Sequence, residues 1–194
     1  MALAHVPLSQ PLDANHLPCE LLEGADGQTT LIAHVARANP VWQQVQDGDA
    51  VLVVFRAEDG YISPNWYPSK HEAHRQVPTW NYRVVHAHGT VTVRQDEKFL
   101  LGVTGRLTRT HEARTQASAP QDHTAWKMSD AAPDYLQQML GAIVGLEITV
   151  TRLEGKFKLG QNRSSADLQG AADGVHAVGQ TALAAQMRQH GQRE

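Results

Sequence analysis

The stretch Tyr61–Tyr82, YISPNWYPSKHEAHRQVPTWNY, gathers five aromatic residues, three prolines and one lysine, although aromatic residues make up only 6% of the chain. Aromatic faces stack on a flat ring, while hydroxyls, backbone N–H groups and a cation bind an anionic tail. The combination suits a flat, partly polar ring that carries an anionic group. A rigid loop, pinned by its prolines, whose aromatic side chains fill a core explains the same composition equally well.

Three segments resemble the PaiB family of FMN-binding transcriptional regulators: YISPNWYPSK at 61–70, VPTWNY at 77–82 and KFKLGQNR at 156–163. The resemblance runs from about Ala14 to about Gly174 with the segments in the same order. The first two segments form a long and compositionally unusual pair, so the match is more specific than a short motif. The N-terminal helix and first strand of the family are expected to be missing or abbreviated here, within Met1–His16.

The resemblance implies a site for the FMN phosphate, a strongly anionic group that needs cationic, hydroxyl or backbone donors. The residues expected to bind the phosphate are Ser69, Lys70, Thr79, Lys158 and Arg163. For Lys158 and Arg163 the ordinary alternative is a solvated surface position.

The isoalloxazine ring of FMN needs an apolar cleft with hydrogen-bond donors at its pyrimidine edge. With the resemblance, the residues expected around the ring are Trp66, Tyr67 and Trp80 as walls, the backbone of Val77, Thr79 and Asn81 as donors, Pro78 as a conformational restraint, and Ser63. Ordinary core packing explains Trp80 as well as ring contact does. The family pattern further predicts that Gln161, Asn162 and Arg163 reach the flavin of a neighbouring protomer.

Hydrophobic patterning predicts strands at 18–22, 29–35, 50–55, 84–94 and 146–159, and helices after Asn39-Pro40, at 96–112, at 135–143 and across 164–194, the last broken near Gly174 and Gly179. Asp59-Gly60 predicts a turn, residues 113–120 a flexible loop, and the prolines exclude regular structure from most of 63–79. Such a strand-rich chain without repeated β-helix-β units indicates an antiparallel barrel. The resemblance specifies a mainly β fold with peripheral helices, the FMN-binding split β-barrel.

Composition bounds the class of protein. The 194 residues, 41% hydrophobic, fit a single domain over 1–194, with a split-barrel core at 14–160 and a C-terminal helical extension at 161–194. Cys19 is the single cysteine, and no apolar run approaches the ~18–20 residues of a membrane helix, so we expect a cytoplasmic protein without membrane contact. The paired histidines 71/74 and 86/88 lack a third ligand at a fixed spacing, so no metal site is expected.

Two classes of function remain open from the sequence. The resemblance implies a homodimeric, FMN-binding negative regulator of transcription with the cofactor at the dimer interface. DNA is a possible partner, but a net charge of −3 and no evident basic recognition helix give it no support. The alternative is an FMN-dependent oxidoreductase or flavin reductase using NAD(P)H, in which the protein orients the ring and excludes water. A flavin-storage or redox-sensing module is a third possibility.

Overall fold

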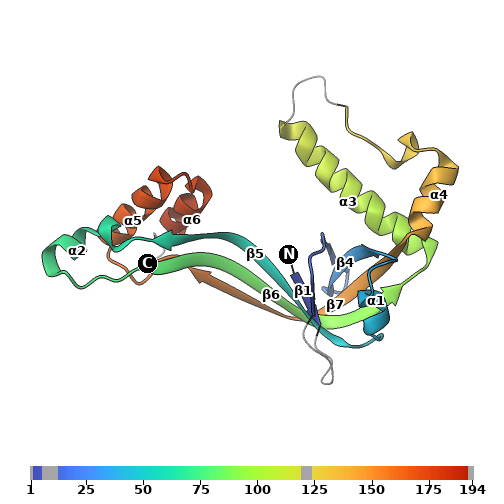
Figure 1. The fold of residues 1–194 in the computed structure, drawn as a ribbon, viewed down its shortest axis with the longest axis horizontal. Helices are drawn as coiled ribbons and strands as arrows, with labels where there is room; N and C mark the ends of the chain where they lie inside the picture. Colours follow the sequence, from blue (N-terminus) through green and yellow to red (C-terminus); the bar gives the residue numbers. More distant parts are fainter. Residues whose placement is uncertain (1, 6–12, 119–123, 192–194) are drawn as a thin grey trace. The chain divides into compact units, whose positions relative to one another are not determined.

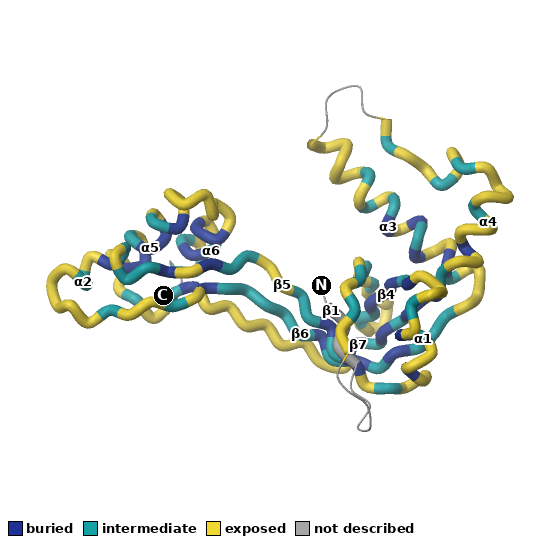
Figure 2. The backbone as a smooth tube through the Cα atoms, in the orientation of Figure 1, coloured by how far each residue is buried: buried dark blue, intermediate teal, exposed yellow. Residues whose placement is uncertain are grey.

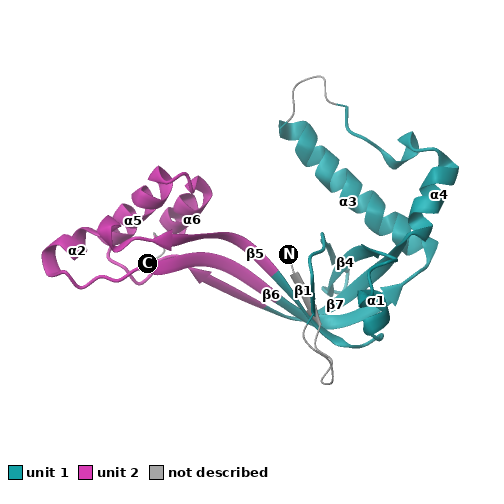
Figure 3. Cartoon of the chain, viewed as in Figure 1, with its two compact units in different colours: residues 1–54, 87–153 teal, residues 55–86, 154–194 magenta. Residues whose placement is uncertain are grey.

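The computed structural model describes residues 2–5, 13–118 and 124–191. The chain divides into two compact units (Figure 3). Unit 1 comprises Met1–Val54 and Ala87–Leu153, and unit 2 comprises Phe55–His86 and Glu154–Glu194. The single-domain organisation expected from the sequence, with its core at 14–160 and extension at 161–194, stays a prediction.

The described residues contain seven strands that form one sheet in the order β2-β1-β5-β6-β7-β4-β3 (Figure 1). The strands are β1 Ala2–His5, β2 Asp13–Asn15, β3 Glu20–Glu23, β4 Thr29–Ala36, β5 Ala50–Ile62, β6 Thr79–Arg94 and β7 Ile143–Lys158. The pairs β1–β2, β1–β5, β3–β4 and β4–β7 are antiparallel. The described residues before β3 contribute two short strands, β1 and β2, which are too brief to produce a visible alternation in the sequence.

The helices lie outside this sheet, which confirms the predicted fold class of β structure with peripheral helices. They are α1 Val41–Gln44, α2 Pro68–Ala73, α3 Glu97–Ser118, α4 Pro133–Gly141, α5 Ser165–Ala177 and α6 Thr181–Gly191, with 3-10 turns at Pro64–Trp66 and Met128–Asp130. In the described ranges no helix combines the length and the apolar character needed to cross a membrane.

The turn predicted at Asp59-Gly60 is wrong, because β5 runs on to Ile62. A Cβ atom at Gly60 would clash with the side chain of Gln180 and lie 2.8 Å from Cδ2 of Leu183 in α6. The glycine is therefore needed for close packing of a helix on the strand, and not for a change of chain direction.

The prediction that prolines exclude regular structure from most of residues 63–79 holds for residues 74–78 but not for Pro64–Trp66 and Pro68–Ala73. Pro64 begins a 3-10 turn and Pro68 occupies the first turn of α2. Proline suits this position because its missing N–H would have no partner there. The helix ends at His74, which has a φ of 54° in the left-handed region.

The predicted break of the C-terminal helices occurs at one of the two glycines. Gly179, with a φ of 86°, follows α5, whereas Gly174 lies inside it. A Cβ atom at Gly174 would overlap the indole ring of Trp66. α5 and α6 form the core of unit 2 together with residues of β5, the α2 region and the end of β7; its buried members include Ile62, Tyr67, Leu159, Leu168, Val175, Leu183 and Met187.

The core of unit 1 is formed by β4, the central strands and α3. Buried residues concentrate in β4 and in the first half of α3, and exposure increases along the second half (Figure 2). Ile32 packs with Val103 and Leu107 of α3. The helix continues to Ser118, so the loop predicted from Ala113 is wrong up to that residue, and 119–120 lie outside the described residues.

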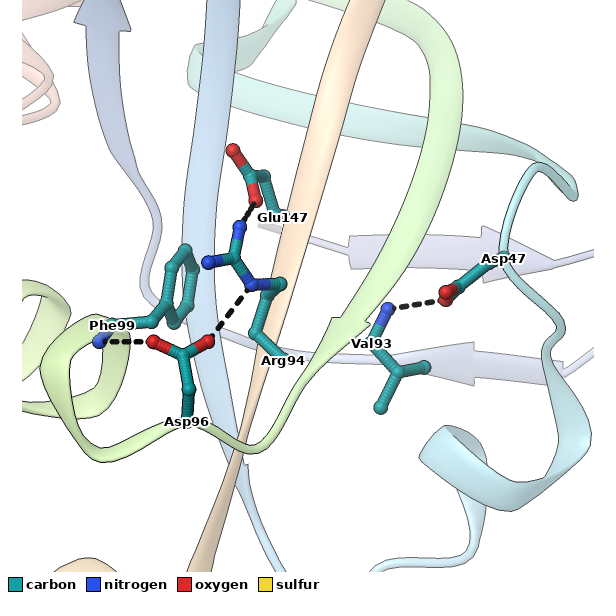
Figure 4. A network of polar contacts seen from close by, with 6 residues as sticks. All are labelled: Asp47, Val93, Arg94, Asp96, Phe99 and Glu147. Atoms are coloured by element: carbon teal, nitrogen blue, oxygen red, sulfur yellow. Dashed lines mark hydrogen bonds and ion pairs between the residues drawn. The ribbon is translucent and has the colours of Figure 1, made fainter.

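A polar network joins the end of β6 to the start of α3 (Figure 4). The Arg94 guanidinium pairs with Glu147 and, at 3.0 Å, with Asp96, and its Cζ lies 4.7 Å from the centroid of the Phe99 ring. The other Asp96 oxygen accepts a hydrogen bond of 2.9 Å from the Phe99 N–H. This backbone bond, aided by Arg94, lowers the pKa of Asp96. The charged carboxylate therefore caps the helix and holds Arg94 over the ring.

Replacing Gly145 with alanine is expected to destabilise unit 1. The new Cβ would lie 2.5 Å from the Phe99 ring and 3.0 Å from the Arg94 carbonyl oxygen, so a packed ring or the backbone has to move. Overpacking of this kind costs about 1–3 kcal/mol, measurable as a lower midpoint in urea unfolding.

Gly102→Ala is the matched control for Gly145→Ala. A Cβ atom at Gly102 meets nothing within 4 Å, and the residue lies inside α3. Alanine there should raise the free energy of unfolding by about 0.5–1 kcal/mol. Equal midpoints for the two variants would contradict the packing assigned to Gly145.

Candidate cofactor-binding site

All fourteen residues expected at the cofactor site belong to unit 2. They come from three regions: the segment from the end of β5 through α2, the approach to β6 with its first residues, and the turn after β7. Since β6 is hydrogen-bonded to both β5 and β7, these regions meet where β5 and β7 end and β6 begins (Figure 1). The tertiary structure thus brings together the residues that the sequence assigned to one site.

Two of the three expected aromatic walls lie in the core of unit 2. Tyr67 is only 3% exposed, and Trp66 is half-buried against the same core. α5 approaches Trp66 so closely that a Cβ atom at Gly170 or Gly174 would overlap it. Core packing, which was the alternative reading of the aromatic stretch, therefore accounts for these two side chains.

Trp80 has the opposite environment. Its side chain is 55% exposed and meets Tyr61, 46% exposed, in an edge-to-face contact with ring centroids 6.3 Å apart. Tyr61 precedes the fully buried Ile62, so successive residues of β5 separate the core from this surface. Val77 nearby in sequence is 68% exposed. This surface can stack on a flat apolar ring, because large aromatic faces lose water favourably when covered.

A cation of β7 and a hydroxyl of β6 contact each other at the end of the sheet that carries Trp80. The Lys158 ammonium group donates a hydrogen bond of 2.5 Å to the hydroxyl of Thr79, the residue that precedes Trp80. Lys70 is half-buried, and its ammonium group finds no partner among the described residues. Lys158 and Lys70 are the two lysines of the expected phosphate set, and neither pairs with an acid in the described contacts.

Ser69 and Arg163 belong to a buried network that sequence reasoning did not find. The Asp167 carboxylate, 5% exposed, accepts bonds from the Ser69 N–H at 3.0 Å and from the Ser69 hydroxyl at 2.7 Å. Gln76 donates to the Ser69 hydroxyl at 2.8 Å and accepts from Arg163 at 2.7 Å. Arg163 also lies over the Tyr67 ring, 4.8 Å from its centroid. The network links α2, α5 and the turn after β7.

Asp167 is ionised in this environment. Burial raises the pKa of its carboxyl group, but hydrogen bonds from Ser69, the nearby Arg163 charge and Ser164 outweigh burial and lower it. Burial raises the pKa of Tyr67 despite the neighbouring Arg163. The Ser-Ser-Ala-Asp pattern at 164–167 marks the start of α5, where the Ser164 hydroxyl accepts from the Asp167 N–H. That pattern could have drawn attention to Asp167, but it does not reveal Ser69 as the partner.

The remaining expected residues are mainly structural in their described contacts. Gln161 closes the turn after β7, accepting from Leu159 N–H and donating to the Phe157 carbonyl, both at 2.8 Å. Ser63 caps the 3-10 turn at Pro64. Asn81 is buried at 2% exposure, whereas Pro78 and Asn162 are exposed.

Unit 2 also contains a small pocket of about 110 Å³, lined by Phe55, Arg56, Ala57, Arg83, Val84, Val85 and Phe157. None of the fourteen expected residues lines it. The charge of Arg83 in its wall is paired with Glu58 at 3.0 Å. The pocket is therefore separate from the surface around Trp80.

The Cys19 thiol in unit 1 is no candidate nucleophile, because burial raises its pKa to about 12.

Residues 2–152 match the family model described as "Putative FMN-binding domain". The protease synthase and sporulation protein PAI 2 of Bacillus subtilis is 30% identical over 154 residues, which cover 79% of this chain and 68% of that protein. The chain belongs to the PaiB family. Membership confirms FMN as the cofactor and the split β-barrel as the fold class. The matched range ends before Lys158, so the family match does not reach that residue or the turn after β7.

One further relative and one solved structure are similar to this chain. A protein of Saccharomyces cerevisiae is 38% identical over 102 residues, 52% of this chain and 60% of the yeast protein. The chain thus spans less than two thirds of that relative. The FAD and heme binding protein from Mycobacterium smegmatis is similar in structure with a TM-score of 0.48 and 18% identity, covering 92% of this chain and 71% of that one.

The residues of unit 2 fit the groups of FMN. Trp80 and Tyr61 offer exposed aromatic surface for a ring, and Lys158, Thr79 and Lys70 offer donors for a phosphate. No buried acid faces Lys158 in the described contacts. The chemistry of this donor set agrees with the cofactor of the PaiB family.

Proposed function

We propose that this protein is a homodimeric FMN-binding regulator whose cofactor site is built on unit 2. The observation that carries the proposal is the exposed Tyr61–Trp80 pair at the same end of β6 where Lys158 donates to the Thr79 hydroxyl. A ring lying over Trp80 would cover apolar surface, while its phosphate tail would reach the two lysines.

Each group has a separate task in this proposal. Lys70 and Lys158, with the Thr79 hydroxyl, bind the phosphate as charge-assisted donors. Trp80 stacks on the ring, and the backbone N–H groups of Val77, Thr79 and Asn81 supply donors to the polar edge of the ring. Bound flavin supplies reversible acceptance of electrons, and the chain's own part is to orient the ring and exclude water from it.

The dimer is supported by the open edges of the strands in unit 2. β1 pairs with β5 at Val51–Val54 and β4 pairs with β7 at Ile143–Thr149. Beyond these residues the described strands provide no neighbour for the outer edge of β5 or β7. Residues 151–158 of β7 are all exposed, including Leu153 at 55% and Phe157 at 40%. A second copy of the chain would cover such edges and complete the cofactor site.

The regulatory role rests on membership of the PaiB family. We propose negative control of transcription, located in the cytoplasm, with contact to DNA either direct or through a partner. The net charge of −3 does not favour direct contact. An NAD(P)H-dependent flavin reductase is the competing function, but no described feature of the chain favours it over the regulator.

A visible spectrum of the purified protein, after FMN is added and the excess removed, tests the proposal. We expect retained flavin bands at one FMN per chain, and a dimer by light scattering. Anaerobic NADPH should leave the bands unchanged over minutes, whereas a mobility shift with genomic DNA fragments should appear and weaken as salt increases. A colourless protein would refute the cofactor site, and rapid bleaching without any DNA shift would replace the regulator with the reductase.

A further inference from the structure

Asp167 makes a two-point contact with the first turn of α2. One carboxylate oxygen accepts from the Ser69 backbone at 3.0 Å and the other from the Ser69 hydroxyl at 2.7 Å. The carboxylate is 5% exposed, and the two bonded residues are 98 positions apart in sequence. Because its backbone N–H and its hydroxyl both donate to Asp167, Ser69 is held in place and has no donor left for a ligand. The residue that follows it is Lys70.

Gln76 extends this contact to the turn after β7. Its amide nitrogen donates to the Ser69 hydroxyl at 2.8 Å, and its amide oxygen accepts from Arg163 at 2.7 Å. The Arg163 guanidinium also lies over the Tyr67 ring, and the backbone N–H of Arg163 donates to the Gly160 carbonyl at 2.9 Å, which anchors the turn. One buried acid thus restrains both α2, which carries Lys70, and the turn that carries Arg163.

We propose that Asp167 is a positioning residue for the phosphate end of the cofactor site, acting through Ser69 on Lys70 and through Gln76 on Arg163. This inference rests on the proposed function. The physical reason is preorganisation: cations held in place before binding lose less freedom when the anion arrives. The carboxylate itself stays under α2 and touches no ligand.

A carboxylate is required for this role because it is an acceptor at both oxygens. In Asp167→Asn one carboxylate oxygen is replaced by an amide group that donates, and this group faces either the Ser69 N–H, which breaks that contact, or the Ser69 hydroxyl, which then accepts and no longer donates. In either orientation the two charge-assisted bonds to Ser69 are lost. α2 then gains freedom although the packing volume at position 167 is almost unchanged.

The test compares FMN with riboflavin, which has the same ring but no phosphate. Full-length wild type and Asp167→Asn are titrated with each flavin by fluorescence quenching. We expect the dissociation constant for FMN to increase about tenfold in the variant while that for riboflavin stays within about twofold. A purely structural role for Asp167 would weaken binding of both flavins alike.

Two further variants complete the design. Asp173→Asn is the matched control, because Asp173 is an exposed acid of the same helix that pairs with Arg188 at 2.7 Å. Gln76→Ala removes the link to Arg163 without changing a buried charge, and it should raise the FMN constant alone by several-fold.

The outcomes distinguish failure of the positioning role of Asp167 from failure of the proposed FMN-binding function. Equal loss of both flavins in Asp167→Asn, or no loss of FMN affinity in either Asp167→Asn or Gln76→Ala, overturns the positioning role. Failure of the wild type to bind FMN overturns the proposed function instead. If Asp167→Asn does not fold, the Gln76→Ala comparison decides the question.

Discussion

Trp66→Ala is expected to lower the free energy of unfolding by about 3 kcal/mol, the lower end of the range for removing a large aromatic side chain from a core. Trp66 is half-buried against the helices of unit 2, and Gly170 and Gly174 of α5 leave space for it. The surrounding backbone is too close-packed to refill the volume of an indole. Urea unfolding followed by circular dichroism should show a lower midpoint with an unchanged slope.

Trp80→Ala is the matched control, since it deletes the same side chain from an exposed position of the same unit. Trp80 is 55% exposed and contacts Tyr61. Its removal should change stability by no more than about 0.5 kcal/mol, yet weaken FMN binding by about 1 kcal/mol through the lost stacking. If Trp66→Ala left the midpoint in place while Trp80→Ala lowered it, the roles assigned to the two tryptophans would be reversed.

Lys70→Ala should weaken FMN binding by about 1.5–3 kcal/mol, the range for a hydrogen bond to a charged group. Lys70 follows the Ser69 contact with Asp167 and has no partner of its own among the described side chains, so its charge is available to an anion. The loss should be visible as an increase of roughly tenfold to a hundredfold in the dissociation constant measured by fluorescence titration.

Lys156→Ala controls for the removal of one positive charge from unit 2. Lys156 is exposed on β7 and lies outside the expected phosphate set. Its replacement should alter FMN affinity by less than about twofold at physiological salt, because exposed charges are screened over short distances. The phosphate assignment fails if riboflavin binding to Lys70→Ala decreases as much as FMN binding does, or if both lysine variants behave alike.

Local pattern was sufficient for much of the fold. The apolar runs at 18–22 and 29–35 correspond to β3 and β4, which pair with each other, and the alternation at 84–94 lies within β6. Predictions failed where glycine and proline have more than one use. Gly60 was interpreted as a turn residue although it allows a helix to approach, and Pro68 as a helix breaker although it occupies a first turn.

The set of residues at the candidate site was predictable from the sequence. Which of these residues pack in the core and which are exposed to a ligand was not. Composition cannot distinguish Trp66, which packs on α5, from Trp80, which is exposed, because each follows a short polar or proline-containing segment. Ser69 and Arg163 were expected to face the phosphate, and they contact Asp167 and Gln76. The capping pattern at 164–167 could have drawn attention to Asp167 but not to its contact with Ser69, and no sequence pattern marks Gln76.

The sequence by itself determined the family, the cofactor and the segments that carry the aromatic and cationic side chains. The family, the cofactor and these segments can be inferred from the types of residue and their order along the chain. Only the tertiary structure decided which side chains are buried and which remain exposed. Burial depends on what packs from elsewhere: α5 covers Trp66, and Asp167 holds Ser69 from 98 residues away. Contacts over such separations are set by the whole fold, so no local pattern specifies them.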